Sequence, residues 1–404
     1  MAEHATSKNR RPPGVYLDNQ ATTPTDPRVV EAMLPFFTER FGNPHSTAHA
    51  FGWDAEEAVE QARGQLAALI GASPREVIFT SGATESNNLA IKGAARFHRE
   101  RRPHAVTLAS EHKCVLESVE QLAREGHRVD VLPVGADGLV DLDLLAETVT
   151  EETAVVSVMA VNNEIGVIQP LAEIAALCRD KGAYFHCDAA QAVGKMPLDV
   201  AALGIDLLSI SGHKFYGPKG IGALYVRRRP RVRLEALIDG GGQERGLRSG
   251  TLATPLCVGL GAAAAIAAAE MEGESARISA LKTRLLEGIR GRLSGVSLNG
   301  HATQRIAGNL NLAFEGVDAE ALMRAMPGLA VSSGSACTSA AVEPSYVLTA
   351  LGLPEARARS SIRLAVGRFN TEAEIDAAVA ELAAQVARLR REGSAAADYS
   401  PVFQ

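Results

Sequence analysis

Short apolar runs alternate with helical stretches through the first half of the chain. Uninterrupted apolar runs of this kind are typical of strands that are buried on both faces of a parallel sheet. Two of the segments between them, 116–124 and 171–181, have the spacing of an amphipathic helix. The alternation predicts an α/β fold with a mostly parallel sheet sandwiched by helices. The predicted strands are 77–80, 105–109, 129–134, 154–161, 183–187 and 207–210.

The pattern changes after Pro255. The expected elements are a long alanine-rich helix at 256–293, a strand at 309–314 whose alternation indicates half burial, a helix at 317–325, a strand at 361–366 and an amphipathic helix at 372–391. This mixture predicts a second, smaller α+β domain. We therefore expect a large domain at 24–265 and a small domain formed by 15–23 and 266–391, with a disordered tail at 1–14 and a flexible tail at 392–404.

Polar residues follow several of the predicted strands directly. Ser81-Gly-Ala-Thr84 follows the first strand, Asn163 and Asp188 follow two others, and Lys214 follows the last. In an open α/β sheet, ligands bind just outside the carboxyl ends of the strands. Because several polar strand ends converge on this edge, the sequence predicts a single binding site there.

Composition narrows the class of protein. Of the 404 residues, 46% are hydrophobic and 22% are charged, which indicates a soluble globular chain. The net charge is 41 − 47 = −6, which argues against a general nucleic-acid or membrane-surface binder. The one dense basic run, Arg227–Arg233, is either a solvated connection or an electropositive docking surface.

The sequence also lacks the patterns of a membrane or secreted protein. We expect no transmembrane span, since the apolar stretch 259–269 is too short and is better interpreted as a buried helix. The N-terminus lacks the apolar core of a signal peptide. Five cysteines without a CxxC pair exclude a zinc site and a disulfide framework and fit a reducing compartment. The expected location is the cytoplasm.

Lys214 is the strongest chemical candidate. It lies in the turn Ser211-Gly-His-Lys214, at the end of a buried strand. Burial lowers the pKa of a lysine amine, and the neutral amine is a nucleophile toward carbonyls that can hold pyridoxal phosphate as a Schiff base. Taken alone, the residue is better explained as a solvated loop lysine, and it is the surrounding residues that reverse this preference.

Other strand ends carry groups that fit the same cofactor. The segment Ser81–Thr84 opens a helix and can bind a phosphate, although an ordinary helix cap has the same sequence. Asp188 can pair with a protonated pyridine nitrogen or cap a helix. His112 can stack on a flat ring or pack as a core histidine. Asn163 and Gln191 can bond a ring hydroxyl or merely satisfy loop backbone.

Two residues of the second half are candidates for substrate chemistry. Arg363 lies inside a predicted strand, where it needs either a substrate carboxylate or an internal ion pair. Cys337 lies among small residues, in Ser332-Ser-Gly-Ser-Ala-Cys337, so its thiol is expected to be accessible and nucleophilic. The other four cysteines lie in apolar segments, where packing is the default.

Ten motifs in family order carry a resemblance that spans about residues 16–391. The chain resembles the group I cysteine desulfurases of the iron–sulfur-cluster-assembly type, which are fold-type I pyridoxal phosphate enzymes of aminotransferase class V. The motifs are Ala-Thr-Thr-Pro (21–24), Phe-Gly-Asn-Pro (41–44), Thr-Ser-Gly-Ala-Thr-Glu-Ser (80–86), Glu-His-Lys (111–113), Val-Asn-Asn-Glu-Ile-Gly (161–166), Asp-Ala-Ala-Gln (188–191), Ser-Gly-His-Lys (211–214), Gly-Gly-Gly-Gln-Glu-Arg-Gly-Leu-Arg-Ser-Gly-Thr (240–251), Ser-Ser-Gly-Ser-Ala-Cys (332–337) and Ser-Ser-Ile-Arg (360–363).

The resemblance assigns roles to these residues. Lys214 carries the cofactor, Asp188 holds the pyridinium nitrogen and His112 stacks on the ring. Gln191 and Asn163 contact the ring oxygen and the substrate side, and Arg363 binds the substrate carboxylate. The residues implied to hold the phosphate are Ala83, Thr84, Ser211 and His213, together with Thr251 from the other subunit of a homodimer.

The implied reaction converts L-cysteine to L-alanine. Lys214 or His112 acts as the base, and Cys337 attacks the substrate sulfur and keeps it as a persulfide. The resemblance implies transfer to an iron–sulfur scaffold and other acceptor proteins, and Cys337 can also ligate a transient [2Fe–2S] cluster shared with the scaffold. The C-terminal end, Tyr399-Ser-Pro-Val-Phe-Gln404, departs from the tail that such enzymes use for scaffold docking.

Three other functions fit some of these residues. A selenocysteine lyase or a small-amino-acid aminotransferase would share the fold and the lysine, but the aminotransferase would not need Cys337. A non-catalytic sulfur-transfer scaffold would need neither Lys214 nor Asp188.

Overall fold

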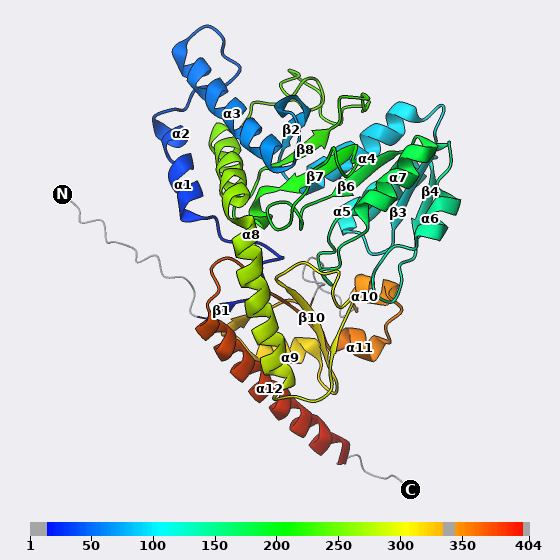
Figure 1. The fold of residues 1–404 in the computed structure, drawn as a ribbon, viewed down its shortest axis with the longest axis vertical. Coiled ribbons are helices and arrows are strands. Elements are labelled where there is room, and N and C mark those ends of the chain that lie inside the picture. Colours follow the sequence, from blue (N-terminus) through cyan, green and yellow to red (C-terminus); the bar gives the residue numbers. More distant parts are fainter. Residues whose placement is uncertain (1–13, 334–343, 399–404) are drawn as a thin grey trace, which may run out of the picture.

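The computed structural model describes residues 14–333 and 344–398, so Cys337 lies outside the described residues. A seven-stranded sheet in the order β2-β8-β7-β6-β5-β3-β4 forms the centre of the larger part (Figure 1). All neighbouring strands are parallel except β8, which is antiparallel to β2 and β7. The strands are β2 Val77–Thr80, β3 His104–Leu108, β4 Arg128–Leu132, β5 Thr153–Met159, β6 Tyr184–Asp188, β7 Leu207–Ser211 and β8 Gly222–Val226. The predicted α/β fold class is confirmed.

Apolar side chains cover both faces of this sheet. Successive residues of one strand belong to different clusters, so that Ile78 packs with α4 and α5 whereas Phe79 packs with α3 and α7. Val155 and Val156 of β5 divide in the same way. Burial on both faces explains why the strands are uninterrupted apolar runs in the sequence. The helices are α1 Pro27–Met33, α2 Pro35–Thr38, α3 Ala50–Leu69, α4 Ala83–His98, α5 Lys113–Arg124, α6 Leu142–Thr148, α7 Leu171–Lys181, α8 Thr254–Arg290, α9 Ala319–Ala325, α10 Tyr346–Ala350, α11 Glu355–Arg359 and α12 Glu372–Asp398.

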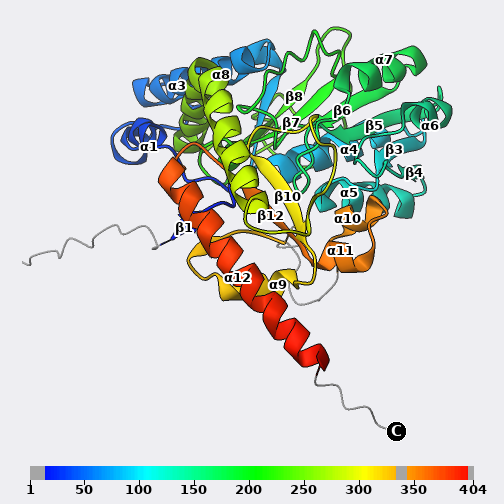
Figure 2. The ribbon, with the colours of Figure 1, turned by 60° about the horizontal axis from the view of Figure 1, so that its bottom comes forward.

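A second apolar core lies below the first in Figure 1. It surrounds an antiparallel sheet in the order β12-β10-β9 and a short parallel pair, β1-β11. These strands are β1 Val15–Tyr16, β9 Val296–Leu298, β10 Asn309–Phe314, β11 Leu329–Ala330 and β12 Ser361–Ala365. Helix α8 passes from one core to the other, since its Ala267 belongs to the first cluster and its Ile278 to the second. Helix α12 packs along the second half of α8 (Figure 2). The predicted domain boundaries stay a prediction.

Three expectations need correction. Strand β10 is buried at all six positions, not half-buried, because its polar residues Asn309 and Asn311 donate to the backbone oxygen of Glu164 in the larger part. Helix α12 runs to Asp398 and does not end at residue 391. Among the described residues, α8 is long and apolar enough by length and composition to cross a membrane, contrary to expectation. Its apolar residues pack into both cores, which accounts for this composition without a membrane.

Candidate active site

A cavity of about 530 Å³ opens at the carboxyl edge of the large sheet. Strand ends of the large sheet form most of its wall, and Gln20, Ala21 and Arg363 close it from the second part of the molecule. Its volume is that of a typical small-molecule site. Ten residues expected from the sequence line this one cavity: Ala83, Thr84, His112, Asn163, Asp188, Gln191, Ser211, His213, Lys214 and Arg363.

Lys214 ends a single helical turn that follows β7 directly. Its Nζ donates to the backbone oxygens of Gln20 (2.9 Å) and Ala21 (2.7 Å). The segment after Ala21 braces the turn, since the Thr23 hydroxyl accepts from the backbone N–H of Tyr216. The half-buried amine is therefore held by neutral carbonyl groups at the mouth of the cavity.

Asp188 is the last residue of β6 and is the register partner of Met159 on the neighbouring strand β5, which also lines the cavity. Its carboxylate accepts from Asn87 Nδ2 at 2.7 Å and from the backbone N–H of Ala190 at 3.0 Å. Asn87 lies on α4 and is fully buried, so it fixes the carboxylate without exposing it to water. The sequence interpretation missed Asn87, for which the only signal is an amide on an otherwise apolar face of a helix.

His112 is the N-cap residue of α5. Its Nδ1 accepts from the backbone N–H of Cys114 at 3.2 Å and lies 3.0 Å from the Cys114 sulfur. Burial lowers the pKa of His112, and the nearby Lys214 adds to this shift while Asp188 opposes it. The ring is therefore neutral near pH 7. Since Nδ1 accepts a backbone hydrogen bond, the proton of the neutral ring is on Nε2.

The phosphate-binding candidate is the N-terminus of α4, a sixteen-residue helix that begins at Ala83. The first backbone N–H groups of a helix have no acceptor within it and favour anions. Gly82 has φ +151°, a conformation that a side chain would strain, and a Cβ on Gly222 would lie 2.6 Å from the Gly82 Cα. The two glycines thus allow strand β8 to approach the turn closely. Ser211 and His213 line the same cavity, and the Ser211 hydroxyl lies 3.9 Å from the position of a Cβ on Gly82.

His213 and Arg363 are two further basic side chains that line the cavity. Burial lowers the pKa of His213 to about 4, with Lys214, Lys219 and Lys195 adding to the shift, and its Nδ1 lies 3.0 Å from the Thr22 hydroxyl. Arg363 is 4% exposed in the middle of β12.

Arg363 makes the ion pair that the sequence left open. It donates to Asp18 Oδ1 and to the backbone oxygen of Asn163, each at 2.7 Å. Among the described residues, its buried Nε and the buried Oδ1 of Asn163 have no hydrogen-bond partner. An ion pair with Asp18 is therefore present, and a buried donor remains at the cavity for a second anion. Asp18 was not among the predicted site residues.

Gln191 follows Asp188 in the same turn. Its Nε2 donates to the Gln20 backbone oxygen at 2.8 Å, and its Oε1 accepts from Lys195 Nζ at 3.0 Å. The Gln20 oxygen thus accepts from both Gln191 and Lys214. Neither Gln20 nor Lys195 was predicted from the sequence.

Thr251 is exposed and does not line the cavity. Two contacts fix its segment to the larger part of the molecule. Glu244 forms a buried, bidentate ion pair with Arg63 and also accepts a hydrogen bond from the Phe79 N–H. Arg248 forms an ion pair with Glu85 in the first turn of α4. The exposed threonine is therefore presented on a firmly anchored surface.

The residues of the cavity fit pyridoxal phosphate. A helix N-terminus, a histidine and two hydroxyls could hold a phosphate, and the buried Asp188 carboxylate could pair with a pyridinium nitrogen. The unpartnered oxygen of Asn163 and nitrogen of Gln20 are polar atoms that a bound group would satisfy. Lys214, Lys219 and Arg363 outnumber Asp188, so the cavity favours a molecule with more than one negative charge.

Comparisons with known proteins agree with this geometry. The family model described as "Aminotransferase class-V" matches residues 15–378. A cysteine desulfurase IscS of Rickettsia bellii is 58% identical over 390 residues, which are 96% of this chain and 93% of the relative. A solved NifS-like protein superposes with a TM-score of 0.87 at 36% identity, covering 93% of this chain and all of that one. The structure titled "SspA in complex with cysteine" has a TM-score of 0.79 at 40% identity, with 88% and 100% covered.

Proposed function

Because this chain belongs to the class V aminotransferase family and is similar to cysteine desulfurases over almost its whole length, we propose that it is a pyridoxal-phosphate-dependent cysteine desulfurase. It takes sulfur from L-cysteine and releases L-alanine. The observation that carries the proposal is the convergence of Lys214, Asp188 and Arg363 on one cavity. Bound pyridoxal phosphate supplies an electron sink next to the α-carbon of the substrate.

The polar side chains divide the work of binding. Lys214 holds the cofactor covalently through Nζ, and the Asp188 carboxylate stabilises a positive ring nitrogen. The N-terminus of α4 binds the phosphate with Ser211 and His213. Arg363 binds the substrate carboxylate through its buried guanidinium, which fixes the α-carbon next to Lys214.

Proton transfer is assigned by the hydrogen bonds of the two candidate bases. The neutral His112 ring carries its proton on Nε2, so that nitrogen faces the reaction as a donor. The other candidate is Lys214 Nζ, which would be free beside the substrate when the substrate amine holds the cofactor and could then accept the α-proton. We therefore assign the base to Lys214, and His112 to ring stacking and proton donation.

Sulfur leaves the substrate by attack of the Cys337 thiolate on the substrate sulfur. The carbon–sulfur bond breaks, its electron pair stays on the carbon, and that carbon takes up a proton to become the alanine methyl group. Cysteine and one enzyme thiol thus become alanine and one enzyme persulfide. The four described cysteines are poor alternatives, because burial raises the pKa of Cys114 to about 12 and shifts the other three thiols in the same direction.

We also propose a homodimer in which Thr251 reaches the phosphate of the partner subunit. Exposed aromatic side chains support a contact surface: Phe41, Phe51 and Trp53 are 64%, 58% and 55% exposed. A hollow lined by Pro44, His45 and Gln243–Arg245 connects this aromatic surface to the segment that carries Thr251. The two features therefore belong to one face.

Sulfur acceptors and the cytoplasm complete the proposal. Iron–sulfur scaffold proteins and other thiol proteins accept the persulfide sulfur, and a nascent [2Fe–2S] cluster takes Cys337 as one ligand during transfer. Residues 14–333 and 344–398 contain no group of three metal-binding side chains, so the remaining ligands come from the scaffold. Cys114, Cys178, Cys187 and Cys257 are all free, which suits a reducing compartment.

The test is incubation of the purified, cofactor-loaded protein with L-cysteine and a thiol acceptor. We expect alanine and acceptor-bound sulfur in equal amounts, with a persulfide on Cys337. Cys337→Ser should keep the cofactor spectrum and lose sulfur release. Sulfur release by Cys337→Ser at the wild-type rate would show that the nucleophile is wrongly assigned, and alanine formation without Cys337 would indicate a different enzyme of the same fold.

A further inference from the structure

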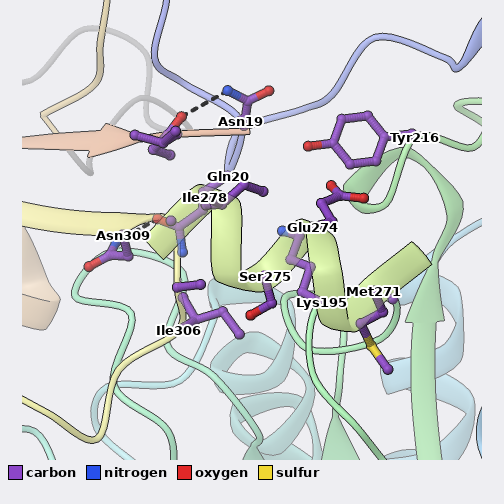
Figure 3. Close-up of a pocket in the computed structure, with 15 residues that line it drawn as sticks. Asn19, Gln20, Lys195, Tyr216, Met271, Glu274, Ser275, Ile278, Ile306 and Asn309 are labelled. Carbon is purple, nitrogen blue, oxygen red and sulfur yellow. Dashed lines mark hydrogen bonds between the residues drawn. The ribbon is translucent and has the colours of Figure 1, made fainter. Parts of the chain in front are cut away.

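Within residues 14–333 and 344–398, Lys195 is a half-buried lysine without a carboxylate partner. It lies in the turn that follows β6, next to α8, and lines a small cavity of about 40 Å³ (Figure 3). None of the ion pairs among the described residues includes it. Glu274, which lines the same small cavity, is instead paired with Arg368 at 2.8 Å.

An ammonium group in this position is unfavourable for stability. Burial lowers the pKa of Lys195 to about 7, Lys214 and Arg363 add to the shift, and Glu274 opposes it. Removing a charge from water without an opposite charge costs several kcal/mol in typical proteins. A methionine or leucine would fill the same space at lower cost, so the lysine requires a reason beyond packing.

Its one hydrogen bond supplies that reason. Lys195 Nζ donates to Gln191 Oε1 at 3.0 Å. Below its pKa Lys195 is an ammonium group, which only donates, so it bonds the oxygen of the amide and not the NH2 group. The Gln191 NH2 group is thereby turned the other way, where one of its protons bonds the Gln20 oxygen at 2.8 Å. Gln191 also lines the catalytic cavity, and its NH2 group has a second proton that the bond to Gln20 does not use.

Lys195 is also connected to Lys214 through this amide. The Gln20 oxygen that accepts from Gln191 accepts from Lys214 Nζ as well, at 2.9 Å. The order is therefore Lys195, Gln191, the Gln20 carbonyl and Lys214. A cation at one end of this series acts on the lysine at the other end by charge and by the orientation of the amide between them.

We infer that Lys195 is a positioning residue that fixes the Gln191 amide as an N–H donor toward the cofactor and places a second cation behind Lys214. The inference rests on the proposed function, because it gives Gln191 an acceptor in the bound cofactor. Without Lys195, the amide can turn over and present its oxygen to the electron-rich ring oxygen, which would repel it. Loss of a nearby cation also makes protonation of the Lys214 nitrogen easier.

The experiment is a pH titration of the cofactor absorbance in the absence of substrate. Lys195→Met should raise the apparent pKa of the bound chromophore by about one unit or more, a tenfold change in proton affinity. The charged groups around Lys195 that remain are Glu274, Lys214 and Arg363, so the shift reports the lost ammonium. The matched control is Lys282→Met on α8, another half-buried lysine with a lowered pKa, which should titrate like the wild type.

A second arm tests whether the effect passes through Gln191. In a Gln191→Ala background, Lys195→Met should shift the chromophore pKa by less than half of the shift that it causes in the wild-type background. Lys195→Arg, made in the wild-type background, should leave most of the wild-type chromophore pKa in place. A Lys195→Met protein that titrates like the wild type, or an equal shift in both backgrounds, would overturn the inference.

The outcome is separable from folding and from the proposed function. If Lys195→Met does not fold, Lys195→Gln is titrated in its place, and loss of folding in every neutral variant would show that the residue is merely structural. If the wild type itself binds no pyridoxal phosphate, the proposed function fails. If the wild type binds the cofactor and desulfurates cysteine but Lys195→Met titrates like the wild type, only the inference about Lys195 is wrong.

Discussion

Each candidate functional group of the cavity has a hydrogen-bond partner that fixes its orientation. Asp188 is held by Asn87, Arg363 by Asp18, His112 by the Cys114 backbone and Lys214 by two carbonyl oxygens. Each hydrogen-bond partner reduces the number of orientations that an otherwise flexible side chain can adopt. A substrate bound there meets groups that are already in place, which lowers the entropic cost of reaction.

Arg363→Lys tests the substrate-binding role. A lysine keeps the charge but loses the planar fork, so it cannot bind Asp18, the Asn163 oxygen and a substrate carboxylate together. Hydrogen bonds to charged groups are worth about 1.5–3 kcal/mol, so we expect the KM for cysteine to rise by roughly 10- to 100-fold with a smaller change in kcat. Steady-state alanine formation measures both. Arg388→Lys, on the exposed side of α12, is the control and should leave KM unchanged; an unchanged KM in Arg363→Lys would exclude the assignment.

The sequence predicts the candidate functional residues but not the residues that fix them by hydrogen bonds. Lys214, Asp188 and His112 follow strands, and strand ends meet at one edge, so their convergence can be derived from the hydrophobic pattern. Asp18 and Arg363 are 345 positions apart, and the contact depends on how the two parts of the molecule pack. No local pattern marks Gln20, Asn87 or Lys195, because amides and lysines are common in loops and on helices.

At the scale of elements, the central strands carry a buried polar ladder. His186 of β6 lies between the Ser157 hydroxyl of β5 at 2.8 Å and the Ser209 hydroxyl of β7 at 2.9 Å. It is fully buried, and burial lowers its pKa to about 3. The ladder ties together the three strands that end at Asp188, Met159 and the Lys214 turn. Because both neighbours are neutral hydroxyls and the site is buried, the charged imidazolium is disfavoured there.

This ladder predicts how stability depends on pH. The unfolded chain binds a proton at His186 near pH 6.5 and the folded chain does not, so the stabilisation is complete above pH 6.5 and is lost as pH falls from there toward the folded pKa. His186→Gln should lose less stability on acidification, by about 1.4 kcal/mol between pH 7.5 and 5.5. Urea unfolding at the two pH values measures the difference. Equal losses in both proteins would mean that His186 does not govern this window.

At the scale of the molecule, two apolar cores share one long helix and enclose the cavity between them. The large sheet supplies the groups that we propose bind the cofactor, and the smaller part supplies Arg363 and the segment whose carbonyl groups accept from Lys214 (Figure 1). The predicted fold class follows from strand and helix periodicity alone. The burial of β10 does not, since alternation of polar and apolar residues looks the same whether the polar face meets water or a second domain.

The proposed dimer predicts complementation between two defective chains. Lys214→Ala should be inactive and Thr251→Ala should bind the cofactor weakly. In a mixed dimer, one site combines Lys214 of one chain with Thr251 of the other, so unfolding and refolding an equal mixture should restore about one quarter of the wild-type activity. Activity after refolding, with each variant refolded alone as the control, measures this. No recovery above the sum of the controls would place Thr251 outside the partner's site.

The central claim is that one amine at the edge of the large sheet carries the cofactor. Borohydride reduction of the loaded protein, followed by digestion and mass spectrometry, converts that link to a stable pyridoxyl group and identifies the residue. We predict the added mass on Lys214 alone, with Lys195 and Lys219 unmodified. A pyridoxyl group on either of those neighbours, or on no lysine of a fully loaded protein, would contradict the account.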